Sequence, residues 1–307
     1  MKLVARLFAG VLFFGAFTPA YPWGATGHHV VALIAEARLS PEVKMRIDRL
    51  LFNGRYTLRD IAACADQIRG SATPGPSRYP VDPACPEVAG TVTGNTAPWH
   101  YIDIPLPTKD RDRQKYCPKG DCVVDQIERL ERVLRESNDD AERRQALLFL
   151  VHFIGDVHQP LHAVERGCDQ GGNRELVNFY LGEDEQANAR LHHVWDTSLV
   201  DKAMKDSGLA DEQALATDLL GRFDDDDARD WSVATPEQMA WESYREAKRH
   251  AYHGIPFEDF CKGYDPKAQH ATDLKSGYER TGARVVRERL MKAGVRLAAA
   301  LNSNVTH

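Results

Sequence analysis

A long apolar helix that carries imidazole and carboxylate groups limits the possible fold more than any other feature of the sequence. Residues 141–159 have a helical pattern that must end before Pro160, because proline cannot continue a helix. Within it, His152 and Asp156 lie four residues apart and therefore project from one face. A charged carboxylate on a buried helix needs a partner, which the surrounding chain must supply. We therefore interpret this helix as a metal-binding element of a helical protein.

The other histidines of this segment have different expected roles. His158 lies two residues beyond Asp156, which turns it about 200° around the helix. We expect it to be a hydrogen-bonded residue of the core or a support for the ligands, since metal ligands need such a shell. His162 follows Pro160 and can point back toward the site.

A second pair repeats the same spacing. His192 and Asp196, in the segment LHHVWD, are again four residues apart, which predicts two ligands on one helical face. Further candidates are His28 in WGATGH, Asp66 in CADQIR and His100 in WHYID. Each of these residues alone is typical of a satisfied polar side chain, so only the whole set indicates a metal site. Imidazole and carboxylate groups together suit zinc.

Helical patterns are also frequent in the remaining chain. They lie at residues 28–39, 40–51, 123–137, 235–252 and 276–302. Strand signals are sparse, and residues 70–98, rich in Pro, Gly, Ser and Thr, predict an irregular loop. The acidic run 223–230 lacks the ligand spacing of a calcium-binding loop, so we expect a solvated loop there. The sequence predicts one mainly α-helical domain over residues 23–307.

The amino terminus has the features of a secretory signal. Lys2 and Arg6 precede an apolar run, which is followed by small residues and prolines. We expect residues 1–22 to be removed, which makes Trp23 the new amino terminus; cleavage after Ala20 is the open alternative. The loss of two cations leaves 37 basic and 45 acidic residues, a net charge of −8. This charge argues against a large basic surface that binds the phosphate backbone of double-stranded nucleic acid. We expect a secreted or periplasmic protein without a membrane anchor.

Six cysteines follow the signal, and an even number in an exported chain predicts disulfides. Cys117 and Cys122 enclose only four residues and are expected to form a small bridge. The other four cysteines are Cys64, Cys85, Cys168 and Cys261. They can form two disulfides in three ways, and the sequence does not choose among these. Cys-X-X-Cys spacing is absent, which argues against a zinc ribbon.

Six motifs in order resemble those of one enzyme family. WGATGH, ADQIR, WHYID, HFIGDVHQPLH, GGN and LHHVWD, between Trp23 and Asp196, are similar to the motifs of the zinc-dependent, single-strand-specific nucleases and 3′-nucleotidases, the type I or S1/P1 nucleases. The resemblance implies a single multi-helix domain of the phospholipase C/nuclease type, with long irregular loops, disulfides and three zinc ions in a cleft. It also implies an endonuclease that hydrolyses single-stranded DNA and RNA to 5′-phosphate products and acts on 3′-nucleotides. We expect a monomer.

The resemblance assigns residues to each of the three zinc ions. The first would be held by Asp66, His100, His152 and Asp156. The second would be held by His162, His192 and Asp196. The third would be held by the amino group and carbonyl oxygen of Trp23, by His28 and by the shared Asp156.

For catalysis, the resemblance implies that Asp66 orients or deprotonates the nucleophile and that Arg69 donates to the phosphoryl oxygens. Tyr101 would stack on an unpaired base, and Asp103 would accept hydrogen bonds from its edge. Asn173, in the GGN motif, would contact the site or shape a turn near it. A stacked base must leave the duplex, which accounts for single-strand preference in an acidic protein.

Two other classes of protein stay open. A zinc-dependent phospholipase C has a similar three-zinc cluster, so the metal ligands do not separate it from a nuclease. Arg69, Tyr101 and Asp103 favour the nuclease. A secreted zinc-binding protein without catalysis is the second alternative. The second zinc would have only three side-chain ligands, which leaves room for water and argues against a closed structural site.

Overall fold

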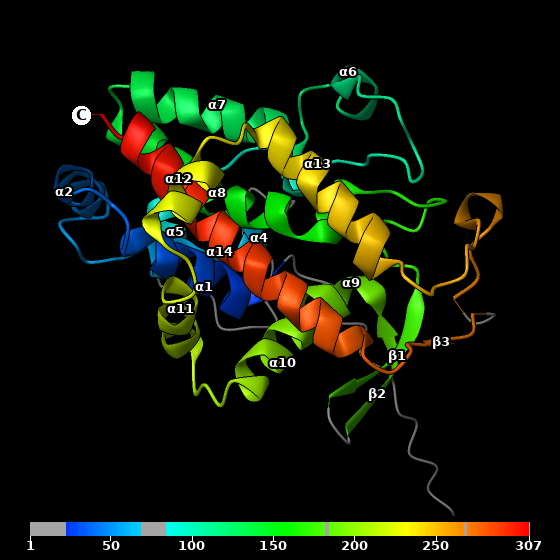
Figure 1. Ribbon diagram of the computed structural model, residues 1–307. Coiled ribbons are helices and arrows are strands. Elements are labelled where there is room, and N and C mark those ends of the chain that lie inside the picture. The colour runs from blue at the N-terminus through cyan, green and yellow to red at the C-terminus, as the bar shows by residue number, and fades with distance from the viewer. Residues whose placement is uncertain (1–22, 69–83, 182–183, 267–268, 307) are drawn as a thin grey trace, which may run out of the picture.

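The computed structural model describes residues 23–68, 84–181, 184–266 and 269–306. Our expectations for the signal segment 1–22, for Arg69 and for the first part of the 70–98 loop lie outside these residues. Within them the protein is mainly α-helical, as the sequence predicts, and it has one small sheet (Figure 1).

The helices and strands follow one another along the chain in this order. The first half contains α1 (Ala25–Glu36), α2 (Pro41–Leu50), α3 (Leu58–Ile61), α4 (Cys64–Gln67), α5 (Ala84–Ala89), η1 (Ala97–His100), α6 (Arg113–Tyr116), α7 (Val123–Glu136), α8 (Asp140–His158) and η2 (Pro160–Ala163). The second half contains β1 (Leu176–Leu181), β2 (Asp184–Arg190), α9 (Leu191–His193), η3 (Val194–Ser198), α10 (Leu199–Asp206), α11 (Glu212–Leu220), α12 (Asp225–Ser232), α13 (Pro236–Glu246), η4 (Ala247–Ala251), η5 (Phe260–Lys262), β3 (Thr272–Asp273) and α14 (Tyr278–Asn304).

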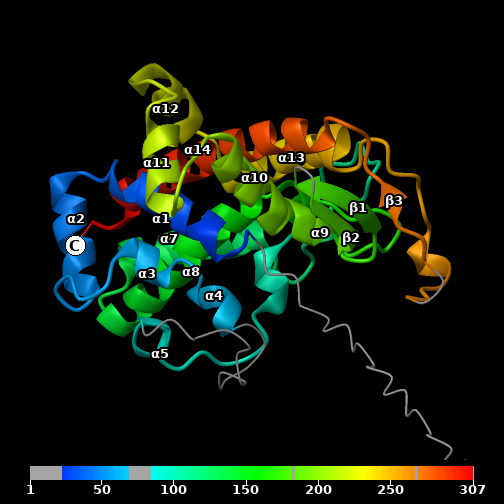
Figure 2. The ribbon, with the colours of Figure 1, turned by 90° about the horizontal axis from the view of Figure 1, so that it is seen from below.

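Helix α8 lies at the centre of the fold. Asp139 caps its start by accepting a hydrogen bond from the N–H of Ala141 at 2.7 Å, and Pro160 follows its end. All side chains from residue 146 to residue 158 are buried, because α1, α7, α13 and α14 pack against the helix. In Figure 2, α13 and α14 lie on one side of α8, and α3, α4 and α5 lie on the other. The helix predicted at residues 141–159 is confirmed, and its polar groups lie inside the protein.

The other predicted helices are present, and their ends lie within three residues of the expected positions when η4 is counted as the continuation of α13. Helix α13 begins as its sequence indicates, with a capping box between Thr235 and Gln238 and with Pro236 in the first turn. It continues into the wider turn η4. None of the helices in the described part of the chain combines the length and the apolar character that a membrane span needs.

The acidic run 223–230 is not a loop, so our expectation for it was wrong. It forms most of α12, where Asp224 accepts hydrogen bonds from the N–H groups of Asp226 and Asp227, both at 2.9 Å. Asp227 in turn accepts a hydrogen bond from the N–H of Asp224 at 3.3 Å. Carboxylates at a helix N-terminus are stabilised by its free N–H groups and by the helix dipole. The like charges therefore cap a helix instead of keeping the segment irregular.

The small sheet is the main feature without a sequence signal. Strand β1 pairs antiparallel with β2 and parallel with β3, in the order β2-β1-β3. An irregularity between Val177 and Phe179 offsets the pairing with β2, and both side chains are buried. The strands are short, and β3 comes from a distant part of the chain, so their pairing leaves little periodicity in the sequence.

Three disulfides join parts of the chain, and they are Cys64–Cys85, Cys117–Cys122 and Cys168–Cys261. The predicted Cys117–Cys122 bridge is confirmed. Cys85 lies on α5, a short helix within the stretch 70–98 that we expected to be irregular throughout. Helix α5 packs against α8 with buried Ala84, Cys85, Val88 and Ala89, and this tertiary contact outweighs the loop-like composition around it.

Candidate metal centre and adjoining pocket

The first group of candidate ligands, Asp66, His100, His152 and Asp156, surrounds the middle of α8. Nε2 of His152 lies 3.3 Å from Oδ2 of Asp156, one helical turn away. Helix α4 adds Asp66, whose Oδ1 is 3.6 Å from His152 Nε2 and 3.6 Å from His100 Nδ1. His100, at the end of η1, has Nδ1 2.9 Å from Asp156 Oδ2. The structure therefore brings these four buried side chains together.

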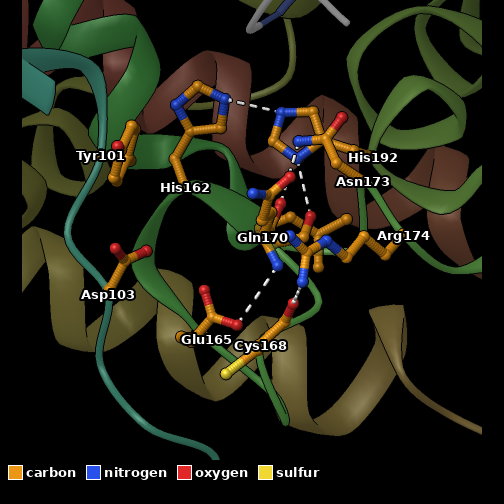
Figure 3. A pocket seen from close by; sticks show the side chains of 11 residues that line it. Tyr101, Asp103, His162, Glu165, Cys168, Gln170, Asn173, Arg174 and His192 are labelled. Carbon is orange, nitrogen blue, oxygen red and sulfur yellow. Dashed lines mark hydrogen bonds between the residues drawn. The ribbon is translucent and has the colours of Figure 1, made fainter. Parts of the chain in front are cut away.

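The second group, His162, His192 and Asp196, lies beyond the end of α8. Nε2 of His162 is 3.1 Å from Nε2 of His192, a contact drawn as a dashed line in Figure 3. His192 Nε2 also lies 3.3 Å from Oδ2 of Asp196. Gln159 donates to Oδ1 of Asp196 at 2.5 Å and so fixes the carboxylate. His192 and Asp196 lie across the junction of α9 with the wider helical turn η3, not in one regular α-helix as expected, yet they still meet.

The third group joins the amino-terminal segment to α8. His28, on α1, has Nε2 3.5 Å from Oδ1 of Asp156, and its ring stacks on that of His152 with centroids 3.8 Å apart. Trp23 is buried beside them, and its indole N–H donates to the carbonyl oxygen of Gly155 at 2.7 Å. Asp156 therefore belongs to both the first and the third group.

Backbone carbonyl groups orient three of the imidazole rings, each through Nδ1 at 2.7–2.8 Å. The pairs are His152 with Ala62, His162 with His100 and His192 with Gly171. When Nδ1–H donates to a carbonyl, Nε2 is left as an unprotonated ligand atom. Gly171 has a φ of +59°, and a Cβ there would lie 2.5 Å from the Leu161 carbonyl oxygen. A side chain at this position would therefore disturb the turn that orients His192.

The donor set suits a divalent metal ion such as zinc. Imidazole nitrogens and carboxylate oxygens are the common protein ligands of zinc besides thiolates. Nε2 of His152 and Oδ1 of Asp156 are buried and make no hydrogen bond to any described residue. Although burial disfavours a charged imidazolium, the carboxylates of Asp156 and Asp66 raise the pKa of His152 to about 10. The buried negative charge thus favours a cation at this place, and a metal ion can replace the proton.

Gly155 allows His28 to approach α8 closely, because a Cβ at this position would lie 2.7 Å from Nδ1 of His28. We expect Gly155→Ala to displace His28, to weaken metal binding by the third group and to lower the free energy of unfolding by about 1–3 kcal/mol through overpacking. Metal titration and urea denaturation measure the two effects. Gly221→Ala is the control, since its new methyl group meets nothing closer than 3.5 Å. A Gly155→Ala protein that binds metal as the wild type does would contradict the assignment.

His158 does not join the candidate ligands. Its Nδ1 lies 2.7 Å from the carbonyl oxygen of Ile154, and Arg296 donates to its Nε2 at 2.9 Å. Burial, together with the nearby charges of Arg289 and Arg296, holds the pKa of His158 well below its usual value. It is therefore a neutral, hydrogen-bonded core residue, as the sequence predicts.

A pocket of about 710 Å³ opens beside the second group (Figure 3). His162 and His192 form one end of its lining, Tyr101 and Asp103 lie along one wall, and Asn173 lies on the opposite side. Asn173 donates from its side-chain amide to the carbonyl oxygen of Gln170 at 2.9 Å, so it supports the turn that it belongs to. The structure thus places the three expected substrate-binding residues around one cavity.

Several residues of this region are not marked by any sequence pattern. Glu165, Cys168, Gln170 and Arg174 also line the pocket. They follow η2 in an irregular segment, where no periodicity marks which side chains share a surface. Gln159 was also missed, although its position inside the motif HFIGDVHQPLH is a signal, because a buried amide between ligands needs a polar partner.

The fold and the site together define a mainly helical protein with buried histidine and aspartate groups that can hold metal ions beside an open pocket. The sequence pattern that describes the S1/P1 nuclease family matches residues 23–306 of this chain. The chain belongs to the S1/P1 nuclease family.

Three nucleases from other organisms are similar to this chain over 64–92% of its length. Endonuclease 4 of Arabidopsis thaliana is 27% identical over 295 residues, which cover 91% of this chain and 88% of the relative. Nuclease S1 of Aspergillus oryzae is 27% identical over 296 residues, 92% of this chain and 91% of the relative. Nuclease P1 of Penicillium citrinum is 30% identical over 203 residues, 64% of this chain and 66% of the relative.

Proposed function

We propose that this protein is a secreted or periplasmic, zinc-dependent endonuclease that acts as a monomer. It hydrolyses phosphodiester bonds of single-stranded DNA and RNA to 5′-phosphate products and also removes phosphate from 3′-nucleotides. The observation that carries this proposal is the clustering of three histidine–aspartate groups around Asp156 and His162, the second of which lines a pocket together with Tyr101 and Asp103. Family membership supports the nuclease reading over a phospholipase C or a non-catalytic zinc protein. The three disulfides support export, since such bonds persist in oxidising compartments.

We assign three zinc ions to the three groups of side chains. The first group is Asp66, His100, His152 and Asp156, the second is His162, His192 and Asp196, and the third is His28, Asp156 and the amino group and carbonyl of Trp23. Zinc supplies a nucleophile by lowering the pKa of bound water to about 7, and it stabilises negative charge on phosphate oxygens. A Trp23 amino group is available only if the segment 1–22 is removed, which intact mass of the exported protein tests.

Further residues bind and orient the substrate in this proposal. Asp66 orients the attacking water and accepts its proton, and Arg69 donates hydrogen bonds to the phosphoryl oxygens as charge builds on them. Tyr101 stacks on one base of the strand, and Asp103 accepts hydrogen bonds from the edge of that base. Asn173 holds the turn at the opposite wall. A paired base cannot enter such a pocket, so single strands are cleaved faster than duplexes.

Zinc content measured together with cleavage of matched single- and double-stranded oligonucleotides tests the proposal. We expect three zinc ions per chain, at least about tenfold faster cleavage of the single strand, and loss of activity with a chelator that added zinc reverses. A choline phospholipid serves as the rival substrate. Fewer than three zinc ions, equal rates on the two nucleic acids, or faster hydrolysis of the lipid would each contradict the proposed function.

A further inference from the structure

Two carboxylate groups face the pocket from neighbouring backbone segments. Asp103 and Glu165 both point into the cavity below Tyr101 and His162 (Figure 3). The backbone around them is hydrogen-bonded, because the N–H of Glu165 donates to the Ile104 carbonyl at 2.9 Å and the N–H of Leu106 donates to the Glu165 carbonyl at 2.8 Å. Their relative position is therefore set by paired backbone instead of by a free loop.

The protein supplies few hydrogen-bond donors to these two groups. Oε1 of Glu165 accepts one hydrogen bond, from the N–H of Gln170 at 3.2 Å. The Asp103 carboxylate makes no hydrogen bond and no ion pair with any described residue. Arg174 also lines the pocket, but it donates to the carbonyl oxygen of Cys168 at 2.9 Å and lies over the ring of Tyr264. A carboxylate has about four acceptor positions, so most of this capacity faces the cavity.

The surroundings of the pair disfavour its full ionisation. Asp103 is exposed to water at the pocket mouth, and the protein atoms around it together with the charge of Asp169 raise its pKa to about 6. Burial and the negative charges of Asp103 and Asp169 raise the pKa of Glu165 to about 7. Asp169 itself is buried behind the pocket, where it accepts a hydrogen bond from the Tyr252 hydroxyl at 2.6 Å. A ligand that brings N–H groups would offset this repulsion.

We propose that Glu165 is a specificity residue that acts with Asp103 to select guanine in the base pocket, with uracil and thymine bound most weakly. This inference rests on the proposed function, since it concerns the base that the pocket accepts. Guanine alone among the bases presents two adjacent N–H donors on one edge, N1–H and the N2 amino group, and these match a carboxylate. Adenine and cytosine present one amino group. Uracil and thymine present a single N–H between two carbonyl oxygens, which repel the carboxylates.

Binding of 5′-GMP and 5′-UMP, measured by calorimetry on the zinc-loaded protein at pH 8, tests this proposal. Both nucleotides carry a 5′-phosphate, which is the group that the expected cleavage products carry. They are therefore products and not substrates, and binding is measured without turnover. We expect the Kd of 5′-GMP to be at least about tenfold lower, because a bidentate contact to a base edge discriminates by roughly 5- to 150-fold. Glu165→Gln places a donor against the guanine donors, so we expect the ratio of the two Kd values to fall below about threefold.

The matched control is Glu258→Gln, which removes the same charge from an exposed residue that does not line the pocket. It should keep the wild-type ratio. Cleavage of a single-stranded oligonucleotide is measured in parallel, so that a failure of the proposed function can be distinguished from a failure of the inference about Glu165. Absence of cleavage would overturn the proposed function. Cleavage with equal Kd values for the two nucleotides, with no binding of either, or with a ratio unchanged by Glu165→Gln would overturn the inference about Glu165.

The same ratio has an expected pH dependence. Protonation removes acceptor positions, so the preference for 5′-GMP should decline as the pH is lowered from 8 to 5, through the raised pKa values of Glu165 and Asp103. Other charged or titratable groups around the pair are Asp169, Arg174, His162 and His192, and Arg166 lies next to Asp169. Titration of these groups and of the phosphate changes the Kd of both nucleotides alike, so the ratio of the two Kd values reports only on recognition of the base. A constant ratio over this range would overturn the inference.

Discussion

Replacing Asp156 with asparagine is expected to lower the rate of single-strand cleavage by more than about a hundredfold. Asp156 is fully buried, and its carboxylate lies 2.9–3.7 Å from imidazole nitrogens of His28, His100, His152 and His162. An amide offers one oxygen and no charge, so it cannot hold two cations at once. Loss of residues that merely support a metal ligand already reduces metal affinity or activity 10- to 100-fold. Loss of a ligand that two metal ions share should therefore reduce the cleavage rate by a larger factor.

Elemental analysis of the purified variant and initial rates on a single-stranded oligonucleotide measure this effect. Asp140→Asn is the matched control, because Asp140 is an exposed residue of the same helix. Among the described residues it forms an ion pair only with Arg143. We expect the control to keep its metal and its rate within about twofold. If Asp156→Asn bound as much zinc as the wild type and cleaved as fast, Asp156 would not be a shared ligand.

Replacing Glu242 with glutamine is expected to lower the free energy of unfolding by about 3 kcal/mol, the lower end of the cost of removing one partner from a buried ion pair. Glu242, on α13, accepts hydrogen bonds from Arg289 at 2.9 Å and from Arg296 at 2.7 and 2.9 Å. Both arginines lie on α14 and are nearly fully buried. Arg289 also donates to the carbonyl oxygen of His158 at 3.0 Å, so this ion-pair cluster fixes the end of α8.

The stability that Glu242 contributes should depend on pH. Although burial opposes ionisation, the two arginines lower its pKa to about 2, below the ordinary value of 4.5. The contribution is therefore complete above about pH 4.5 and is lost as the pH falls toward 2. Urea denaturation of the wild type and Glu242→Gln between pH 7 and pH 3 should show a narrowing difference. Glu237→Gln, on the exposed side of α13, is the control, and an equal loss of stability in both variants would contradict the role of the cluster.

The sequence predicted those parts of the fold and site that depend on local spacing. The i,i+4 pair of His152 with Asp156 follows from helical geometry, and the end of α8 follows from Pro160. His192 and Asp196 also meet as their spacing predicts, although the helix there is not regular. The convergence of these pairs with His28, Asp66 and His100 depended on the resemblance to a family, because nothing local shows that distant segments meet. The acid-capped helix α12 was mispredicted, since composition indicates solvation but not hydrogen bonding.

The pocket was harder to predict than the metal groups. Tyr101 and Asp103 follow a recognisable motif, whereas Glu165 and Arg174 occur in a segment with no regular pattern. Their positions depend on the pairing of that segment with residues 104–106 and on the disulfide between Cys168 and Cys261. Both are tertiary contacts, and spacing along the chain does not encode them.

Two of the disulfides make the geometry of the site depend on the redox state of its surroundings. Cys64–Cys85 ties the short helix that carries Asp66 to α5, and Cys168–Cys261 ties the pocket wall to a segment 93 residues further along. A chain in a reducing cytosol lacks both bonds, and with them the constraint on Asp66 and on the pocket wall. With the export that we propose, assembly of the site would be coupled to oxidation outside the cytosol. An enzyme that degrades nucleic acid would thereby be kept incomplete while it shares a compartment with the nucleic acid of its own cell.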